Sequence, residues 1–483
     1  MKIWIVFDDT GKKSEVITDI IGEKGFAQVV VKKRRLESYY QESVGKLYSE
    51  AEWKWVHSLF QFEELAGELE RLSGEELRVL HCFSNFLISD EKKVLLSYEK
   101  LRYVDEPYRV LSGNQIAAVC FPDAGSYLAY CGLIRSGKRP LEGAKSVKEA
   151  FSIEGLVDIG RIGNFIQCIT GNFDSRYFNS LQGDEYTLVK SSKNKKKIKS
   201  EYTYYYLLPE DMRFWYVMPF DYEEDETQAS YRMERLHITD LAIKWVHGSV
   251  DEEEFEELMD KFFYFFRSRH QRSCTKEEYE ALAKSLYVDK VRERISELKA
   301  LPEYEKIGEI LAASGDSIDD LADRYFQLKE QIEKRKKYPY VSVIGHGDPC
   351  FANTLYNRST KTLKFIDPKG ALAEEELWTN PYYDVAKLSH SVCGRYDFFN
   401  NALFDIRLDE SFSHQLDIRF DHTRYMEIFR KKAEENGFDF LTVRIYEASL
   451  FLSMLPLHMD NPFKVLGFIL NVKMILKEIG ENV

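Results

Sequence analysis

The residues best suited to chemistry lie between positions 341 and 370, where acidic and amide side chains follow short apolar stretches. Asn353 comes five residues after Asp348, and Asp367 follows a second apolar stretch. Transfer of a γ-phosphoryl group requires an aligned hydroxyl nucleophile and metal ions that bridge the phosphates. An Asp can accept the hydroxyl proton, and an Asn can share a Mg²⁺ with a second Asp. The spacing therefore predicts phosphoryl transfer, with Asp348 as base and Asn353 and Asp367 as metal ligands.

A hairpin is expected to bring the two metal ligands together. Residues 354–356 and 362–366 have the composition of short strands, and the polar residues 357–361 between them are typical of a turn. His346 is expected to fix the loop rather than to act as a base, because Asp348 already suits that role. The alternative for the whole set is a group of structural acidic residues in turns.

The sequence His346-Gly-Asp348-x4-Asn353, followed by Ile366-Asp367, resembles the phosphotransferase motif of the aminoglycoside phosphotransferase and choline kinase family. The resemblance extends over residues 160 to 480 and is strongest between positions 341 and 397. It implies a protein-kinase-like bilobal α+β fold and an enzyme that uses ATP and Mg²⁺.

Further positions refine this resemblance. Asp384 matches the acidic residue that helps to hold the family's catalytic loop. Asp367-Pro-Lys-Gly370 stands where protein kinases carry Asp-Phe-Gly, and Gly347 stands where they carry Arg. No Ala-Pro-Glu sequence follows. These departures favour a small-molecule acceptor over a protein and argue against a mobile switch at residues 367–370.

The upstream half of a kinase-like domain is also visible. Residues 186–190 alternate as a strand does and end on Lys190, and residues 200–208 are expected to form a helix that begins near Glu201. Lys190 would contact the α and β phosphates, with Glu201 as its ion-pair partner. Residues 215–219 and 228–236 are expected to be the next strands. The second ends at candidate adenine-binding hinge residues Met233, Glu234 and Leu236.

The glycine-rich phosphate loop of protein kinases has no match here. Arg176, in the first expected hairpin, is the candidate phosphate contact in its place. The run 193–199 is rich in Lys and is expected to be a solvated loop, with an anion-binding role as the alternative. The segments 158–160, 176–179 and 190–192 resemble bacterial surface-polysaccharide proteins that join a nucleotidyltransferase-like domain to such a kinase. This resemblance points to sugar or polyol chemistry.

The first 155 residues are expected to form a separate α/β domain. Apolar runs at 4–7, 27–31, 77–81 and 116–120 alternate with helix-forming stretches at 63–72 and 91–96, which favours a mostly parallel sheet. The pattern resembles sugar nucleotidyltransferases and glycosyltransferases, but their glycine-rich loop is replaced by residues 7–12. The domain is therefore interpreted as degenerate, binding or orienting the kinase's substrate. Asp8 and Asp9 are expected to form a polar turn, with a metal site as the alternative.

The remaining chain, residues 246–483, is expected to be a helical lobe, after an N-lobe at 156–245. Helices are predicted at 251–263, 318–332, 423–435, 442–453 and 463–479. His458 and Asp460 lie in the turn before the last helix and are candidates for binding the acceptor's hydroxyl groups, with helix capping as the alternative.

Composition agrees with an enzyme of at least two domains. The chain has 483 residues, more than a single core usually organises, and 44% are hydrophobic. A net charge of −13 argues against a nucleic-acid-binding surface. No apolar run approaches the length of a membrane span, and the seven scattered cysteines are typical of reduced thiols in a cytoplasmic protein.

Together these features predict an ATP- and Mg²⁺-dependent kinase acting on a small hydroxylated acceptor, a sugar or polyol of surface-polysaccharide synthesis. Two alternatives stay open. One is an inactive pseudokinase that serves as a binding module, and the other is an active sugar nucleotidyltransferase in the first domain.

Overall fold

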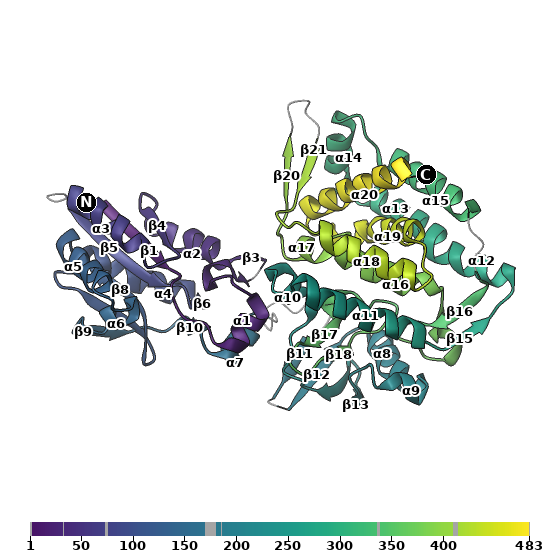
Figure 1. Cartoon of the computed structure of the whole chain (residues 1–483), viewed down its shortest axis with the longest axis horizontal. Coiled ribbons are helices and arrows are strands. Elements are labelled where there is room, and N and C mark those ends of the chain that lie inside the picture. The colour runs from purple at the N-terminus through teal and green to yellow at the C-terminus, as the bar shows by residue number, and fades with distance from the viewer. Residues whose placement is uncertain are drawn as a thin grey trace. The chain divides into compact units, whose positions relative to one another are not determined.

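The computed structural model describes residues 2–31, 33–72, 76–169, 180–184, 186–335, 339–408 and 414–482. The chain forms two compact units, and Figure 1 labels most of their helices and strands. The first comprises Met1–Asp174 with His247–Ser249, and the second comprises Ser175–Val246 with Val250–Val483. Each unit is described by itself below.

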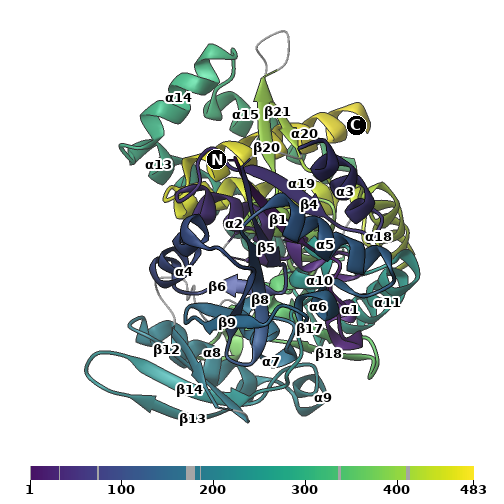
Figure 2. The same cartoon turned by 90° about the vertical axis from the view of Figure 1, so that its left-hand side faces the viewer.

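The first unit is built on a mixed six-stranded sheet in the order β4-β1-β5-β8-β7-β9. Its central strands β1, β5 and β8 face the viewer in Figure 2. In chain order the six are β1 (Lys2–Asp8), β4 (Glu52–Val56), β5 (Leu77–Phe83), β7 (Tyr108–Ser112), β8 (Gln115–Phe121) and β9 (Glu149–Ser152). The helices are α1 (Glu15–Ile21), α2 (Leu36–Gly45), α3 (Gln61–Arg71), α4 (Glu91–Tyr98), α5 (Ala124–Arg135), α6 (Pro140–Ala144) and α7 (Ile162–Ile169).

The prediction of a mostly parallel sheet is confirmed for this unit, because five of its six strands run in the same direction. β1 is parallel to β4 and β5, β7 is parallel to β9, and β8 alone runs antiparallel to its neighbours β5 and β7. The reversal between β7 and β8 is made by a tight turn at Gly113-Asn114, where Gly113 has a φ of 57°. A two-residue turn joins antiparallel strands only.

The expected strand at 27–31 is absent from this sheet. Phe26–Gln28 is a 3₁₀ turn, and the short β2 (Val30–Val31) pairs only with β3 (Arg34–Arg35). A separate pair is formed by β6 (Phe86–Ile88) and β10 (Leu156–Asp158).

The second unit begins with a four-stranded antiparallel sheet in the order β11-β12-β14-β13. The strands are β11 (Ser180–Gly183), β12 (Thr187–Ser192), β13 (Pro219–Glu224) and β14 (Ala229–Glu234). Helix α8 (Lys195–Leu207) packs on this sheet through Ile198, which belongs to one apolar cluster with Tyr231 and Met233.

Two predictions in this lobe need correction. The lysine-rich run was expected to be a loop, but α8 begins at Lys195 because the Asn194 side chain accepts a hydrogen bond from the N–H of Lys197. The strand expected at 215–219 begins only at Pro219, because Trp215 and Tyr216 are buried and the Trp215 carbonyl accepts the Phe365 N–H at 2.7 Å.

The rest of the second unit is mainly helical and surrounds α19 (Phe440–Met454). Its other helices are α9 (Glu210–Arg213), α10 (Leu241–His247), α11 (Glu252–Ser268), α12 (Lys276–Lys284), α13 (Lys290–Ala300), α14 (Tyr304–Ala313), α15 (Ile318–Arg335), α16 (Pro381–Val392), α17 (Tyr396–Asn400), α18 (Thr423–Glu435) and α20 (Pro462–Asn482). The helices predicted from 251 onward are therefore confirmed, with ends that differ by a few residues. Short strands β15 (Gln271–Ser273), β16 (Val341–Ile344), β19 (Trp378–Thr379), β20 (Asp405–Leu408) and β21 (His414–Asp417) complete the lobe.

Helix α19 is the core of this lobe. Among the described residues, Phe440–His458 is the one segment long and apolar enough to cross a membrane by length and composition, although no apolar run of that length was expected. Its mean hydropathy is 1.3, and 78% of the segment is buried inside the protein. It packs against α13, α15, α16 and α20. A core helix passes the same test, so the segment is weak evidence for a membrane span.

Candidate active site

The predicted hairpin is confirmed and places Asn353 beside the segment that leads to Asp367. β17 (Thr354–Asn357) and β18 (Thr362–Phe365) pair in antiparallel register, with Thr354 opposite Phe365. Just before this ladder, the N–H of Ile366 donates to the carbonyl of Asn353 at 3.0 Å. Asp367 follows with a φ of 56°, a left-handed conformation that Asp tolerates better than most residues.

His346 links the two halves of this site through its ring. The ring is buried, and its Nδ1 accepts the backbone N–H of Asp348 at 3.0 Å. Nε2 lies 3.0 Å from the carbonyl oxygen of Ile366 and, as the protonated nitrogen, donates to it. Burial lowers the pKa of His346 below its ordinary value, so the imidazole is neutral near pH 7. Both nitrogens are occupied, and the geometry suits a residue that fixes the loop.

Asp384 holds the backbone of the loop that carries Asp348. Its carboxylate accepts the N–H of His346 at 3.0 Å and the N–H of Gly347 at 2.8 Å. Arg269, at the end of α11, contacts the same carboxylate at 2.9 Å, and both side chains are almost fully buried. Asp384 therefore lies where the sequence placed a supporting residue. Sequence reasoning missed Arg269, which is 115 positions away along the chain.

The segment after Asp367 is fixed to both lobes. Lys369 donates its N–H to the His346 carbonyl at 2.9 Å, and Ala371 donates its N–H to the Ser200 carbonyl in α8 at 3.0 Å. Gly347 has a φ of 84°, and a Cβ there would lie 2.5 Å from the Lys369 Cβ. A residue with a side chain, such as the Arg of protein kinases, does not fit at position 347.

Lys190 of β12 bridges the two lobes. Its Nζ lies 2.7 Å from Glu201 Oε2 in α8 and 2.7 Å from Asp367 Oδ1. Burial opposes the charged form of Lys190, but the two carboxylates outweigh it and raise its pKa. A strand lysine paired with a helix glutamate beside an Asp of this kind is the arrangement of an active protein kinase. The second unit thus has a kinase-like fold.

Asp348 has a partner that sequence reasoning missed. Lys387 of α16 places its Nζ 3.1 Å from Asp348 Oδ1. Burial would lower the pKa of Lys387, but Asp348 and Tyr383 raise it above its ordinary value, so the side chain is a permanent cation. Lys387 follows Asp384 by three residues in one helix, so both face the same loop. That spacing is the only sequence signal that points to Lys387.

The side chains of Asn353 and Asp367 fit a Mg²⁺ ion carried by a nucleotide. Asn353 donates its Nδ2 to the Asp348 carbonyl at 3.0 Å, which leaves its Oδ1 without a hydrogen bond from any described residue. Asp367 is 38% exposed, and Lys190 uses only Oδ1. Mg²⁺ prefers oxygen ligands and is usually bound by one or two carboxylates together with substrate phosphates. Across the described parts of the chain, no three His, Cys, Asp or Glu side chains group as a metal site.

Two further carboxylates with raised pKa values lie near the catalytic loop. Burial raises the pKa of Asp397 to about 7, with Asp240 and Asp348 adding to the rise and the Ser391 hydroxyl opposing it. Burial likewise raises the pKa of Asp240 to about 7. Within the described chain, neither oxygen of Asp397 has a hydrogen bond of good geometry. Asp397 was not among the residues expected from the sequence.

His458 and Asp460, the residues predicted to bind the acceptor, lie in the turn before α20. His458 lies 3.4 Å from Lys464 through its Nδ1 and packs edge-on against Phe468. Burial lowers the pKa of His390 in α16, and Lys387 and His458 lower it further. Asp460 is exposed.

The residues predicted to contact the nucleotide lie in different parts of the chain. Met233 and Glu234 end β14 as predicted, with Met233 buried and Glu234 exposed, and Leu236 follows half-buried. A narrow pocket beneath them is lined by Met233, Glu201 and Asp367. Arg176 lies outside the described residues.

In the first unit, Asp8 and Asp9 are held by internal contacts. Asp8 lies 3.1 Å from His81 Nε2 and accepts the Thr10 N–H at 2.9 Å. Asp9 accepts the Ser84 hydroxyl at 2.6 Å and the Ala27 N–H at 3.1 Å. These contacts agree with the polar turn that the sequence favours.

No protein-family model matches the chain, and no curated protein matches it significantly. Among solved structures, it is similar to a thermostable mutant of aminoglycoside phosphotransferase APH(4)-Ia in its apo form. The identity is 12% and the TM-score 0.35, over 63% of this chain and 94% of that one.

A second structure is aminoglycoside phosphotransferase APH(3'')-Id from Streptomyces rimosus in complex with ADP and streptomycin. It is 16% identical with a TM-score of 0.32, over 61% of this chain and 98% of that one. A third is a ternary complex of the APH(4)-Ia mutant with ADP and hygromycin B, at 11% identity and a TM-score of 0.36, over 65% and 97%. Similarity this low does not place the chain in a family. The kinase-like fold rests on the geometry around Lys190, Asp348 and Asp367.

Proposed function

We propose that the chain is an ATP- and Mg²⁺-dependent phosphotransferase that phosphorylates a hydroxyl group of a small molecule. The observation that carries this proposal is the position of Lys190, whose ammonium joins Glu201 of α8 to Asp367 at 2.7 Å each. In phosphoryl transfer these groups must be assembled together before the nucleotide can be held productively. Here they are assembled, and the loop with Asp348 is fixed beside them.

In the proposed reaction Asp348 accepts the proton of the acceptor's hydroxyl, and Lys387 holds its carboxylate in one orientation. Lys190 offsets negative charge on the phosphates, while Asn353 and Asp367 would hold Mg²⁺. The metal, when bound, neutralises charge that develops on the phosphate oxygens. His346 and Asp384 position the loop without contacting the reacting atoms.

For the acceptor we propose a sugar or polyol, used in surface-polysaccharide synthesis. His458 and Asp460 remain the candidate contacts for the acceptor's hydroxyl groups. The surface-polysaccharide setting is supported by the sequence resemblance of segments 158–160 and 190–192.

For residues 1–155 we propose substrate binding rather than nucleotidyl transfer. Asp8 and Asp9, the acidic pair at the end of β1, are already occupied by hydrogen bonds within the unit. Release of pyrophosphate from a nucleoside triphosphate and a sugar phosphate would show instead that this part is an active nucleotidyltransferase.

The test is phosphoryl transfer from ATP with Mg²⁺ to a panel of sugars, polyols, choline and aminoglycosides. Wild type is compared with Asp348→Asn and Asp367→Asn, and Asp319→Asn serves as a matched control because Asp319 pairs with Lys299 on the surface. We expect product from wild type and the control, and a loss of orders of magnitude in the two site variants. If no acceptor is phosphorylated and ATP binds without Mg²⁺ dependence, the chain is a pseudokinase module.

A further inference from the structure

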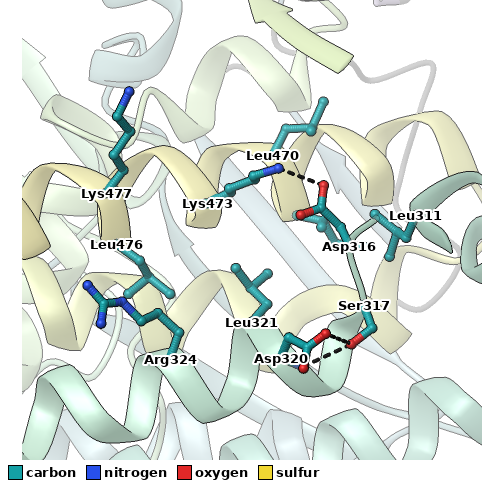
Figure 3. A pocket seen from close by; sticks show the side chains of 11 residues that line it. Leu311, Asp316, Ser317, Asp320, Leu321, Arg324, Leu470, Lys473, Leu476 and Lys477 are labelled. Atoms are coloured by element: carbon teal, nitrogen blue, oxygen red, sulfur yellow. Dashed lines mark hydrogen bonds and ion pairs between the residues drawn. The ribbon is translucent and has the colours of Figure 1, made fainter. Parts of the chain in front are cut away.

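A cavity of about 350 Å³ lies in the second unit between α15, α20 and the turn that follows α14 (Figure 3). Its volume falls within the range of about 300–1,000 Å³ that is typical of small-molecule sites. The apolar part of its wall is formed by Leu311, Leu321, Ile469, Leu470 and Leu476. None of the residues that line it belongs to the candidate active site.

The charged residues of the cavity differ between its two ends. At one end Lys473 and Asp316 form an ion pair of 2.6 Å, and the Ser317 hydroxyl donates to Asp320 at 2.7 Å. At the other end Figure 3 shows Arg324 and Lys477 on either side of Leu476. No ion pair within the described chain involves either of these two cations. The cavity is therefore apolar along its wall and positively charged at one end.

The position of Arg324 is shaped by a glycine. A Cβ at Gly480 of α20 would lie 2.7 Å from Arg324 Nη2, closer than such atoms can approach. The guanidinium thus rests in space that a side chain at position 480 would fill. A planar guanidinium can bind a carboxylate or phosphate through two parallel hydrogen bonds.

We propose that this cavity binds a small amphipathic anion, whose carboxylate or phosphate lies at Arg324 while its apolar body lies along the leucines. Burial of the apolar body supplies affinity, and the Arg324 guanidinium selects the charge of the ligand. Binding here does not depend on phosphoryl transfer, so the two proposals fail independently.

The test is calorimetric titration of the full-length protein with octanoate and with octyl phosphate, below their micellar concentrations. Octanol and octylamine are the matched controls for charge. We expect both anions to bind, and octanol and octylamine to bind at least about tenfold more weakly, because each loses a charge-assisted hydrogen bond. Binding of one anion alone would identify the acidic group that the cavity takes.

Two variants separate this site from a general apolar groove. Gly480→Ala must displace the Arg324 guanidinium, yet alanine favours a helix, so the fold is retained. Arg324→Gln removes the charge at an exposed position. Both should weaken octanoate binding about tenfold or more, whereas Lys473→Gln, at the paired end, should leave it within about twofold. Equal binding of octanol and octanoate, or unchanged binding in both variants, would overturn the proposal.

Discussion

The ion pair between Lys387 and Asp348 allows a sharp prediction about the proposed base. Lys387→Met keeps the length and apolar volume of the side chain but removes the ammonium that lies 3.1 Å from Asp348 Oδ1. The side chain of Lys387 is 14% exposed and that of Asp348 is 39% exposed. Asp348 would therefore remain solvated in the variant, but it would lose the contact that holds its carboxylate in one orientation.

The size of the effect follows from these exposures. A hydrogen bond between charged groups contributes about 1.5–3 kcal/mol when it is shielded from water. Asp348 is more than one-third exposed, so screening by solvent reduces this to about 1–2 kcal/mol. At about 1.4 kcal/mol for each factor of ten, kcat should fall about 5- to 30-fold.

The assay is steady-state phosphoryl transfer at saturating acceptor, with thermal unfolding measured in parallel. The KM for ATP should stay within about twofold, because Lys387 touches none of the groups around Lys190. Lys387→Arg retains the positive charge and should recover part of kcat. An unchanged kcat in the Met variant would refute the role of this ion pair. An equal loss in both variants with a lower Tm would show that packing alone is responsible.

Three further predictions concern the surroundings of the loop. Asp384→Asn leaves Arg269 buried without a carboxylate, so the free energy of unfolding should fall by about 3–5 kcal/mol, measured by denaturant titration, together with activity. Asp397→Asn should have a higher free energy of unfolding than wild type. The difference should grow between about pH 4 and pH 7 and reach at most about 4 kcal/mol at higher pH. Chelation of Mg²⁺ should abolish turnover, and Asp367→Asn should raise the Mg²⁺ concentration needed for half-maximal rate.

The sign for Asp397 follows from its raised pKa of about 7 in the folded chain. Between about pH 4 and pH 7 the folded state keeps a proton that the unfolded chain releases, so wild type loses stability as the pH rises through this window. The Asn variant has no such loss. A stability difference between Asp397→Asn and wild type that stays constant from pH 4 to 8 would contradict the first argument. An Asp384→Asn protein as stable as wild type would contradict the role of the buried ion pair with Arg269. Turnover in excess chelator would contradict the requirement for Mg²⁺.

Sequence reasoning located the parts of the site that are close along the chain. Asn353 and Asp367 are joined by one hairpin whose turn is visible in residues 357–361, and pairing of β17 with β18 then places them together. Lys190 lies in β12, and Glu201 lies in α8, the helix that follows this strand. In each case the two residues are brought together by neighbouring secondary-structure elements, and the periodicity of apolar residues along the sequence predicts such elements.

The contacts that sequence reasoning missed depend on how distant helices pack. Arg269 meets Asp384 only because α11 and α16 lie on the same side of the loop, and Lys387 reaches Asp348 from the same helix as Asp384. Asp397 is buried by the packing around α17, which no pattern in residues 396–400 indicates. In the first unit the Gly113-Asn114 turn was a readable hairpin signal, and it accounts for the one antiparallel strand, β8, in a sheet otherwise parallel as predicted.

The carboxylate of Asp384 also determines the order in which parts of the protein fold. It satisfies two backbone N–H groups of the loop while its charge is balanced by Arg269 from the end of α11. The loop can take its working shape only after α11 and α16 have docked, since an unbalanced buried carboxylate would be strongly unfavourable. Catalytic activity is therefore gained late in folding. A chain that has formed its secondary structure without docking these helices would have no activity. Recovery of activity after dilution from denaturant should consequently lag behind recovery of helical signal.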